Sequence, residues 1–375
     1  MDNPLTKIFS SLSVFSSGSK DSAIGVDIGS SAIKVVEIKR KKGKVQLETY
    51  GAIALGPYAD QDIGRVTNLQ AGKLAEGLKE VLKQSGITGN VLALSVPIQS
   101  SLVFTIELPA TIKEGDMSAI VATEARKYIP VPISEVSLDY FALPKKEASF
   151  EELSGLMSQK EKVEKIRVLV VATQNDAISR LRSVVSEAGK EASFFEIEIF
   201  SSIRANFEHE LSPVLLLDFG AARTKLSIVE FGTVKIYHTI DRGSADITAS
   251  IAQSLSIPFS EAEKMKKEFG LLGSPSEKTL ADIIKTHTDY IFAEANSVLL
   301  NYEKKSNRTL SKVILSGGGA AMKGLKEAAL GNFRAEIEIG KPFSKVGAPA
   351  FLEKVLEAMG PEFAVAIGLA LRELQ

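Results

Sequence analysis

Two stretches of the chain repeat one short pattern of residues that suits the binding of phosphate groups. Residues 25–34 read Gly-Val-Asp-Ile-Gly-Ser-Ser-Ala-Ile-Lys, and residues 215–225 read Leu-Leu-Leu-Asp-Phe-Gly-Ala-Ala-Arg-Thr-Lys. Each stretch predicts two strands joined by a tight turn, where a glycine lets backbone N–H groups approach anionic oxygens. The copies share an aspartate, a glycine and a lysine at the same spacing: Asp27 and Asp218, Gly29 and Gly220, Lys34 and Lys225.

The duplication, rather than either copy, carries the functional prediction. A single Asp-x-Gly turn often does nothing more than reverse the chain. Repeats this far apart indicate two related domains instead of a short-period repeat protein. Further strand-like runs follow each copy, near residues 45–50 and 233–239. Two hairpins, each with one carboxylate, therefore predict a clamp that holds a nucleotide between two lobes.

A third glycine-rich turn, Gly317-Gly318-Gly319, follows the apolar run 313–316 and precedes a helix expected near 323–330. One interpretation is a dinucleotide fingerprint, but its G-x-G-x-x-G pattern would need a glycine where Met322 stands. That interpretation also leaves both Asp-Gly hairpins unexplained. The alternative is that the turn lets the backbone approach an adenosine base and ribose. No Walker A element occurs, so hairpins would have to hold any nucleoside triphosphate.

The composition excludes several other kinds of site. A net charge of −1 over 375 residues gives no overall field that favours nucleic acid. The chain has no cysteine, which excludes disulfides, thiolate catalysis and cysteine-ligated zinc. His209, His238 and His287 are scattered without the spacing of metal ligands.

The sequence predicts no membrane-spanning helix, because no apolar run approaches the roughly 20 residues that a bilayer requires. Residues 1–20 mix apolar side chains with serines and Lys7, which does not resemble a cleaved signal peptide. Two interpretations of this stretch stay open. It is either a disordered lead-in or a short amphipathic segment that touches a partner or a membrane surface.

The order of expected strands and helices divides the chain into five parts. These are a lead-in at 1–21, a first lobe from 22–96 and 189–211, an inserted subdomain at 97–188, a second lobe from 212–245 and 312–375, and its subdomain at 246–311. Within the insertion, the charge-rich stretch 145–165 predicts a solvated loop or a short exposed helix. Ser260 and Glu263 have the spacing of a capping box, so Glu263 has a purely structural interpretation too.

Those elements, in that order, resemble the actin–hexokinase–chaperone ATPase superfamily. Residues 25–34 and 215–224 look like its two phosphate motifs, and residues 314–325 look like its adenosine motif. Residues 194–200 and 363–371 resemble its two connecting segments at the hinge. The resemblance implies an α/β, actin-like ATPase fold in which two related ribonuclease-H-like lobes surround a nucleotide cleft.

Within the superfamily, the inserted subdomain is similar to that of the FtsA division proteins and the PilM family of type IV pilus assembly. The closer resemblance is to the PilM family, through residues 25–34, 124–132, 196–198 and 363–372. Ile199 departs from the proline usual after the residue equivalent to Glu198. FtsA proteins carry a terminal amphipathic membrane helix, and we expect none here.

The resemblance implies ATP and Mg²⁺ as ligands. Asp27 and Asp218 would be catalytic and would hold Mg²⁺ mainly through its water shell, and Glu198 would order the attacking water. The other residues implied in nucleotide binding are Gly29, Ser30, Ser31, Lys34, Gly220, Ala221, Arg223, Thr224, Glu263, Lys266, Gly317, Gly318, Gly319 and Lys323. Simpler interpretations stay open: turn capping for the aspartates, a solvated strand residue for Lys34, and a helix surface pair for Glu263 and Lys266.

The resemblance also implies a cellular role. The partner would be the cytoplasmic N-terminal peptide of PilN, docked between the first lobe and the insertion, with other inner-membrane pilus proteins nearby. The protein would be cytoplasmic and peripheral to the inner membrane through that partner, in pilus assembly or related type II secretion. ATP hydrolysis and homo-oligomer formation stay open, and the alternatives are an FtsA-like division protein or a small-molecule kinase of the same fold.

Overall fold

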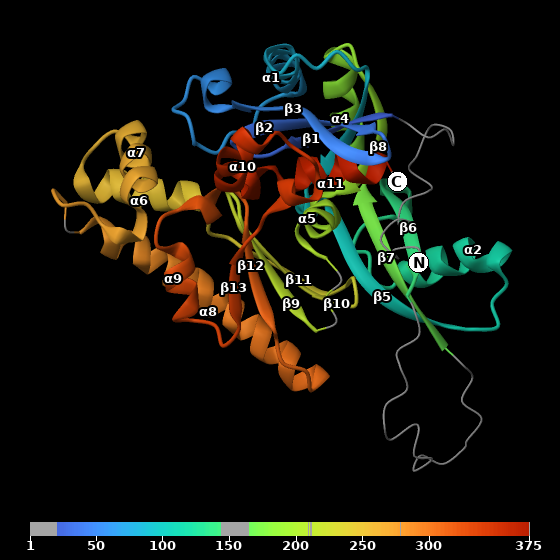
Figure 1. The fold of residues 1–375 in the computed structure, drawn as a ribbon. Coiled ribbons are helices and arrows are strands. Elements are labelled where there is room, and N and C mark those ends of the chain that lie inside the picture. The colour runs from blue at the N-terminus through green and yellow to red at the C-terminus, as the bar shows by residue number, and fades with distance from the viewer. Residues whose placement is uncertain (1–20, 144–164, 209, 211, 278, 375) are drawn as a thin grey trace.

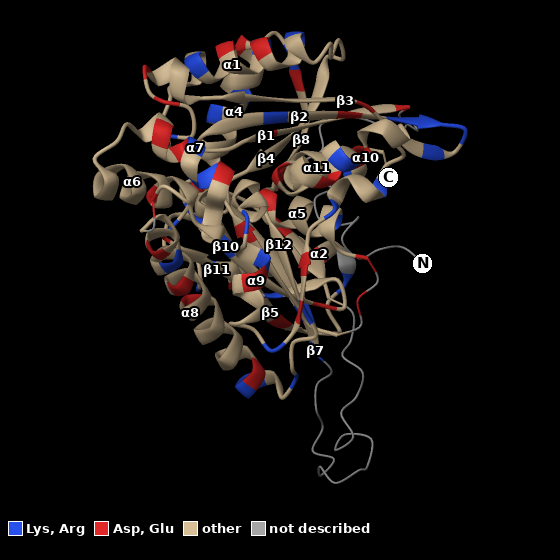
Figure 2. Cartoon of the chain, turned by 60° about the vertical axis from the view of Figure 1, so that its left-hand side comes forward, with Lys and Arg blue, Asp and Glu red and all other residues tan. Residues whose placement is uncertain are grey.

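The structure is a computed structural model that describes residues 21–143, 165–208, 210, 212–277 and 279–374. Residues 1–20, most of the charged stretch 145–165, and His209 lie outside the described residues. The described chain forms two five-stranded sheets and one three-stranded sheet (Figure 1). Basic and acidic residues intermingle over α1 (Ala71–Gln84), α7 (Phe259–Phe269) and α8 (Leu280–Ser306), and the tip of the hairpin formed by β2 (Ala32–Lys41) and β3 (Lys44–Ala54) is basic (Figure 2).

The first lobe is a sheet in the order β3-β2-β1-β4-β8. Its strands are β1 (Ser22–Ile28), β2 (Ala32–Lys41), β3 (Lys44–Ala54), β4 (Val91–Val96) and β8 (Glu191–Ile197). Strands β1, β2 and β3 pair antiparallel, whereas β4 runs parallel to β1 and β8. Helix α1 (Ala71–Gln84) packs its apolar side chains on one face of this sheet, and α11 (Ala364–Glu373) covers the other.

Helix α4 (Asn175–Glu187) belongs to the first lobe by its packing. Its buried side chains Ile178, Leu181, Val184 and Val185 lie in the same apolar cluster as those of α1. The sequence analysis placed this helix inside the insertion at 97–188, so that boundary is corrected here. The apolar face of α4 packs against α1 and the first sheet. This is a long-range contact that local periodicity does not reveal.

The second lobe repeats the first in topology. Its sheet has the order β11-β10-β9-β12-β13, again three antiparallel strands followed by two parallel ones. Helices α8 (Leu280–Ser306) and α9 (Leu325–Leu330) pack on one face. The strands are β9 (Val214–Phe219), β10 (Thr224–Glu230), β11 (Thr233–Ile240), β12 (Lys312–Ser316) and β13 (Glu336–Ile339). The two related lobes predicted from the repeated hairpins are confirmed.

Two helices join the lobes at the centre of the molecule. Helix α5 (Glu198–Asn206) packs Ile199, Phe200 and Ile203 against the second sheet, and it also touches α11 (Figure 1). Strand β8 ends at Ile197, within the segment 194–200 that resembles a connecting segment of the hinge. Glu198 is therefore the first residue of a helix at the junction of the two lobes.

The insertion contributes a separate small sheet. Strands β5 (Ser101–Pro109), β7 (Lys165–Gln174) and β6 (Val136–Ala142) lie in that order, with α2 (Glu114–Ala125) packed against them. Helix α2 ends at Ala125, ahead of the two prolines Pro130 and Pro132.

A helical subdomain extends the second lobe. Helices α6 (Ser244–Leu255) and α7 (Phe259–Phe269) pack with the start of α8 around Ile247, Ile251 and Ile284. One further short helix, α10 (Glu353–Met359), precedes α11. Residues of this subdomain, of α10 and of the second lobe's glycine turn all border the space between the lobes.

Candidate functional site

A cavity of about 900 Å³ opens between the two lobes. Its floor is formed by the turns that follow β1 and β9, and its sides come from α7, α10 and the glycine turn after β12. The residues proposed from the sequence that line it are Asp27, Gly29, Ser30, Ser31, Lys34, Glu198, Asp218, Gly220, Ala221, Glu263, Lys266, Gly317, Gly318 and Gly319. The folding of the chain thus brings both hairpins and the glycine turn to one space.

Three of the proposed residues lie elsewhere. The hydroxyl of Thr224 is buried and donates to the backbone oxygen of Arg242 at 2.9 Å. Arg223 pairs with Asp241 at 2.6 Å and lines a neighbouring cavity. Lys323 is exposed and is not among the lining residues of the cleft. Because side chains alternate along a strand, the inward position of Thr224 turns the next residue, a lysine, toward the cleft.

Each hairpin sets its aspartate opposite its lysine. Asp27 and Lys34 are partners across β1 and β2, with Lys34 Nζ 3.8 Å from the Asp27 carboxylate. Asp218 and Lys225 occupy the matching positions across β9 and β10, at 3.9 Å. Ser95 also donates its hydroxyl to Asp27 at 2.8 Å. The common spacing seen in the sequence is therefore an antiparallel register, repeated in both lobes.

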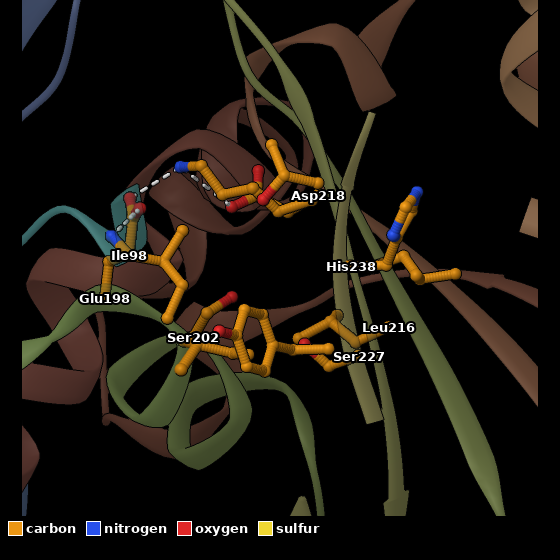
Figure 3. Close-up of a pocket in the computed structure, with 12 residues that line it drawn as sticks. Ile98, Glu198, Ser202, Leu216, Asp218, Ser227 and His238 are labelled. Atoms are coloured by element: carbon orange, nitrogen blue, oxygen red, sulfur yellow. Dashed lines mark hydrogen bonds and ion pairs between the residues drawn. The ribbon is translucent and has the colours of Figure 1, made fainter. Parts of the chain in front are cut away.

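Glu198 lies at the junction of the lobes with both carboxylate oxygens engaged. Oε1 accepts the backbone N–H of Ile98 at 3.0 Å, and Oε2 accepts Lys225 Nζ at 2.5 Å (Figure 3). Burial raises the pKa of Glu198, and Lys225 acts against that rise. Burial alone would lower the pKa of Lys225, but Glu198 and Asp218 outweigh it and raise that pKa. Burial thus dominates at Glu198, whereas the neighbouring carboxylates dominate at Lys225.

Lys266 is tied down by protein groups. Its ammonium group lies 2.6 and 2.9 Å from two Ser244 oxygens, 2.7 Å from Thr248 Oγ1 and 2.7 Å from Glu263 Oε2. An ammonium has three N–H donors, so these acceptors use all of them. Burial lowers the pKa of Lys266, with Glu263 opposing. Lys266 therefore fastens α7 to α6 within the cleft wall.

Glu263 takes part in the same network and not in a helix cap. Burial would raise its pKa, but Lys266 and the hydroxyl of Thr248, which donates at 2.6 Å, lower it. The capping box predicted from Ser260 does not form, because α7 already begins at Phe259, after Pro258. Proline fixes the extended backbone that starts the helix and leaves Ser260 inside the first turn.

The turn after β12 needs its glycines to approach the second hairpin. Gly317 has φ +80°, and a Cβ there would lie 2.2 Å from Asp218 Oδ1. A Cβ on Gly319 would lie 2.8 Å from that of Phe219, whereas one on Gly318 would meet nothing closer than 3.8 Å. This close approach leaves a strip of bare backbone along one side of the cleft.

The sequence analysis missed a loop of the first lobe, residues 63–65, that reaches α7 at the edge of the cleft. We call this loop the strap. In the first lobe, Ile63 and Gly64 line the cavity, and a Cβ on Gly64 would lie 3.2 Å from Glu263 Cδ. The guanidinium of the next residue, Arg65, lies over the Phe259 ring of α7. No local pattern marks this loop. Lys225 was also missed as a site residue, although its spacing from Asp218 pointed to it.

A second cavity of about 480 Å³ adjoins the cleft. It lies where the first lobe, the start of the insertion and the second hairpin meet, with apolar walls from Leu55, Leu69, Leu74 and Leu181. The residues that line both cavities are Gly29, Ser30, Glu198, Gly220, Ala221 and Lys225. The two hairpin turns therefore form a partition between the two spaces.

The cleft fits a magnesium-bound nucleotide. Its volume lies in the range of small-molecule sites, and its floor offers glycine and serine N–H groups with two lysines. In the described ranges no cluster of three or more acidic or histidine side chains could hold a metal. Mg²⁺ usually keeps several waters and takes only one or two carboxylates beside phosphate oxygens, which suits Asp27 and Asp218.

Comparison with known protein families decides between the candidate relatives. A family model described as "Type IV pilus assembly protein PilM" matches residues 25–374. The chain belongs to the PilM family. The resemblance inferred from the hairpins and the terminal helix is thus confirmed across nearly the whole sequence.

Solved structures confirm the actin-like fold of this PilM-family chain. The PilM-PilN type IV pilus biogenesis complex superimposes with a TM-score of 0.78, at 24% identity over 96% of this chain and 100% of that one. EutJ from Carboxydothermus hydrogenoformans gives 0.52 at 16% identity, covering 94% and 90%. MreB5 of Spiroplasma citri bound to ADP gives 0.51 at 12% identity, covering 95% and 97%.

Curated relatives are FtsA proteins. FtsA of Helicobacter pylori strain J99 is 25% identical over 230 residues, covering 54% of this chain and 46% of its own. FtsA of Staphylococcus epidermidis is 24% identical over 359 residues, covering 85% and 74%. The chain thus spans about half the length of the first of these relatives. Among the helices that the structure describes, none combines the length and apolar character needed to cross a membrane.

Proposed function

We propose that this PilM-family chain binds Mg²⁺–ATP between its lobes and uses it to set lobe closure during pilus assembly. The observation that carries the proposal is the meeting of two equivalent Asp–Lys hairpins on one cavity. Opposed turns from two lobes reach a polyphosphate from both sides, so ligand affinity depends on how far the lobes close. The MreB5 neighbour supports this proposal, since that protein has the same fold and was solved with ADP.

The residues divide the work of binding by their chemistry. The backbone N–H groups of Gly29, Ser30 and Gly220 face the phosphates, and Lys34 supplies positive charge. Asp27 and Asp218 orient the water shell of Mg²⁺, which when bound neutralises charge on the phosphate oxygens. The bare backbone of Gly317, Gly318 and Gly319 lies beside the adenosine.

ATP acts mainly as a ligand in this proposal. In this structure both carboxylate oxygens of Glu198 are engaged, one by the Ile98 N–H and one by Lys225, so this carboxylate serves as a contact between the lobes. The nucleotide then contributes by favouring the closed arrangement of the lobes, and the coupling works through differential affinity.

Calorimetry with Mg²⁺–ATP tests the site. Asp27→Ala and Asp218→Ala should each weaken binding by about tenfold or more, since each removes a charge-assisted contact to the hydrated metal. Asp289→Ala is the matched control, because Asp289 is an exposed aspartate that pairs with Lys285 on α8. Unchanged affinity in both cleft variants would contradict the proposal.

The proposed partner is the cytoplasmic N-terminal peptide of PilN. The PilM-PilN complex, which shares this fold over its full length, supports that choice. The second cavity offers leucine walls at the border of the first lobe and the insertion, suited to apolar side chains of an extended peptide. Binding there would hold the protein peripherally at the cytoplasmic face of the inner membrane. The shared lining of the two cavities would let ATP alter peptide affinity.

A titration of the PilN peptide with and without Mg²⁺–ATP tests the partner. Ala177→Trp should abolish binding, because Ala177 lines the cavity and the indole would fill it. Ala119→Trp on the exposed face of α2 is the control and should bind as the wild type does. Failure of the wild-type protein to bind under both conditions would remove the PilN assignment and leave nucleotide binding intact.

A cell-division role of FtsA type is the second candidate, favoured by the FtsA relatives. FtsA-type proteins contact the membrane themselves. Sedimentation of the protein with liposomes in the absence of any partner would favour this alternative over the pilus role.

A further inference from the structure

The two hairpins are equivalent in register but differ in what their lysines reach. Lys34 and Lys225 lie at nearly the same distance from the aspartates of their own hairpins, 3.8 and 3.9 Å. Lys225 also contacts Glu198, at 2.5 Å. Lys225 belongs to β10 of the second lobe, whereas Glu198 directly follows β8 of the first. This ion pair therefore bridges the two lobes at the floor of the cleft.

Under the proposed function, a polyphosphate held along the two hairpin turns would end near Lys225. Lys225 lines the nucleotide cleft and the second cavity alike, so its ammonium lies at the partition formed by the two hairpin turns. Glu198 lies beside Ile98 on one side of this space and Asp218 faces it from the other (Figure 3). The charged groups around Lys225 are the carboxylates of Glu198, Asp218 and Asp27.

We propose that Lys225 is a positioning residue that distinguishes a nucleoside triphosphate from a diphosphate. In this structure it holds Glu198, and it turns toward the terminal phosphate when a triphosphate binds. This inference rests on the proposed nucleotide function and identifies the residue that responds to the number of phosphates in the nucleotide. Its consequence is that only a triphosphate draws Lys225 away from Glu198 and so alters the bridge between the lobes.

The chemistry of lysine suits this exchange of partners. Its ammonium carries three donors on a flexible four-carbon stem, so it can move between acceptors without a change of backbone. A terminal phosphate carries more negative charge and more acceptor oxygens than a carboxylate, and it competes well for the same cation. A diphosphate ends before the partition, which leaves the Lys225–Glu198 pair in place.

Binding measurements with a Lys225→Met variant test the inference. Calorimetry with Mg²⁺ and a non-hydrolysable ATP analogue should show at least a tenfold loss of affinity relative to wild type, and Mg²⁺–ADP less than about a twofold loss. The matched control is Lys312→Met. Lys312 also lies on a strand of the second lobe, is 19% exposed against 22% for Lys225, and pairs with Glu210 and Glu338 away from the cleft. It should bind both nucleotides as the wild type does.

Hydrogen exchange at the backbone amide of Ile98 gives a second readout that needs no turnover. This amide donates to Glu198, so it reports how firmly that carboxylate is held. The triphosphate analogue should speed its exchange in the wild type relative to ADP. In Lys225→Met the exchange should be fast without nucleotide and insensitive to which nucleotide is added. Lys225→Arg, which keeps the charge, should retain the wild-type pattern.

The outcomes separate the inference from the function on which it rests. Wild-type protein that binds neither nucleotide would overturn both. Wild-type binding with an equal loss, or no loss, of the two affinities in Lys225→Met would overturn the role of Lys225 alone. Should Lys225→Met not fold, the double variant Glu198→Gln/Lys225→Met removes both charges of the pair. It must show the same selective loss of triphosphate affinity for the inference to stand.

Discussion

The guanidinium carbon of Arg65 lies 4.2 Å from the centroid of the Phe259 ring. Arg65 follows the first-lobe residues that line the cleft, and Phe259 is the first residue of α7 in the second lobe. The contact therefore bridges the two lobes next to the residues that line the cleft. Next to this contact, Gly64 of the strap lies close to Glu263 of α7.

Removing this contact should speed nucleotide release. A partly exposed cation–π contact contributes about 0.5–1 kcal/mol, so Arg65→Ala should raise the dissociation rate of a fluorescent ATP analogue by about two- to fivefold. Stopped-flow chase with unlabelled ATP measures that rate. Arg182→Ala is the control, because Arg182 lies over Phe195 within the first lobe. Equal release rates for the two variants would show that the strap does not gate the cleft.

The glycine turn after β12 should tolerate substitution at one position and not at its neighbour. Gly317→Ala puts a Cβ into Asp218 and also strains a backbone with φ +80°. We expect it to lower the free energy of unfolding by about 1–3 kcal/mol and to weaken Mg²⁺–ATP binding. Gly318→Ala meets only Glu362, at an ordinary van der Waals distance of 3.8 Å, and should keep wild-type stability. Urea unfolding and calorimetry on both variants check the contrast, and equal stability of the two would contradict it.

Local patterns in the sequence predicted the hairpins well. The turns at Gly29 and Gly220 depend on residues within ten positions, and the register of Asp27 with Lys34 follows from turn length alone. Helix α8, which begins at Leu280, likewise has the long and regular apolar spacing that a local pattern can reveal. These features need no knowledge of distant contacts.

Features that depend on distant contacts were not predictable. Nothing near Lys266 in sequence shows that Ser244 and Thr248 will occupy its donors. Likewise, the Glu198–Lys225 pair joins residues of different lobes, and the Arg65–Phe259 contact joins a loop to a helix almost two hundred positions away. A single sequence carries periodicity and turn chemistry, but these pairings arise only when segments far apart in the chain fold against each other.

Because α5 and α11 are in close contact at Gly368, substitution of this glycine should destabilise the protein. A Cβ at Gly368 would lie 1.9 Å from the backbone oxygen of Ser201, which cannot move without shifting a helix. Overpacking of this kind costs about 1–3 kcal/mol, so Gly368→Ala should lower the urea midpoint with an unchanged m-value. Gly115→Ala in α2 is the control, since a Cβ there meets nothing within 4 Å. That variant should be as stable as wild type or slightly more so.

The buried carboxylate of Glu196 ties together the elements at the hinge. The loss of stability on removing this carboxylate should depend on pH. Glu196 at the end of β8 is 1% exposed and lies 2.7 Å from Arg204 of α5 and 2.8 Å from Arg372 of α11. Burial alone would raise the pKa of Glu196, but the two guanidiniums outweigh it and hold the pKa below its ordinary value of 4.5. A carboxyl with a lowered folded pKa stabilises the protein fully above its unfolded pKa and loses that contribution as pH falls through the folded one.

Glu196→Gln should therefore be about 3–5 kcal/mol less stable than wild type at pH 7, because it leaves two buried guanidiniums without their carboxylate. This difference in the free energy of unfolding should stay constant down to about pH 4.5 and then become smaller, as the wild-type carboxyl becomes protonated. Urea unfolding at a series of pH values measures it. Glu76→Gln, which breaks an exposed pair with Lys73, should cost at most about 1 kcal/mol. A gap that does not narrow under acid would mean that packing, and not the charge of Glu196, holds the hinge.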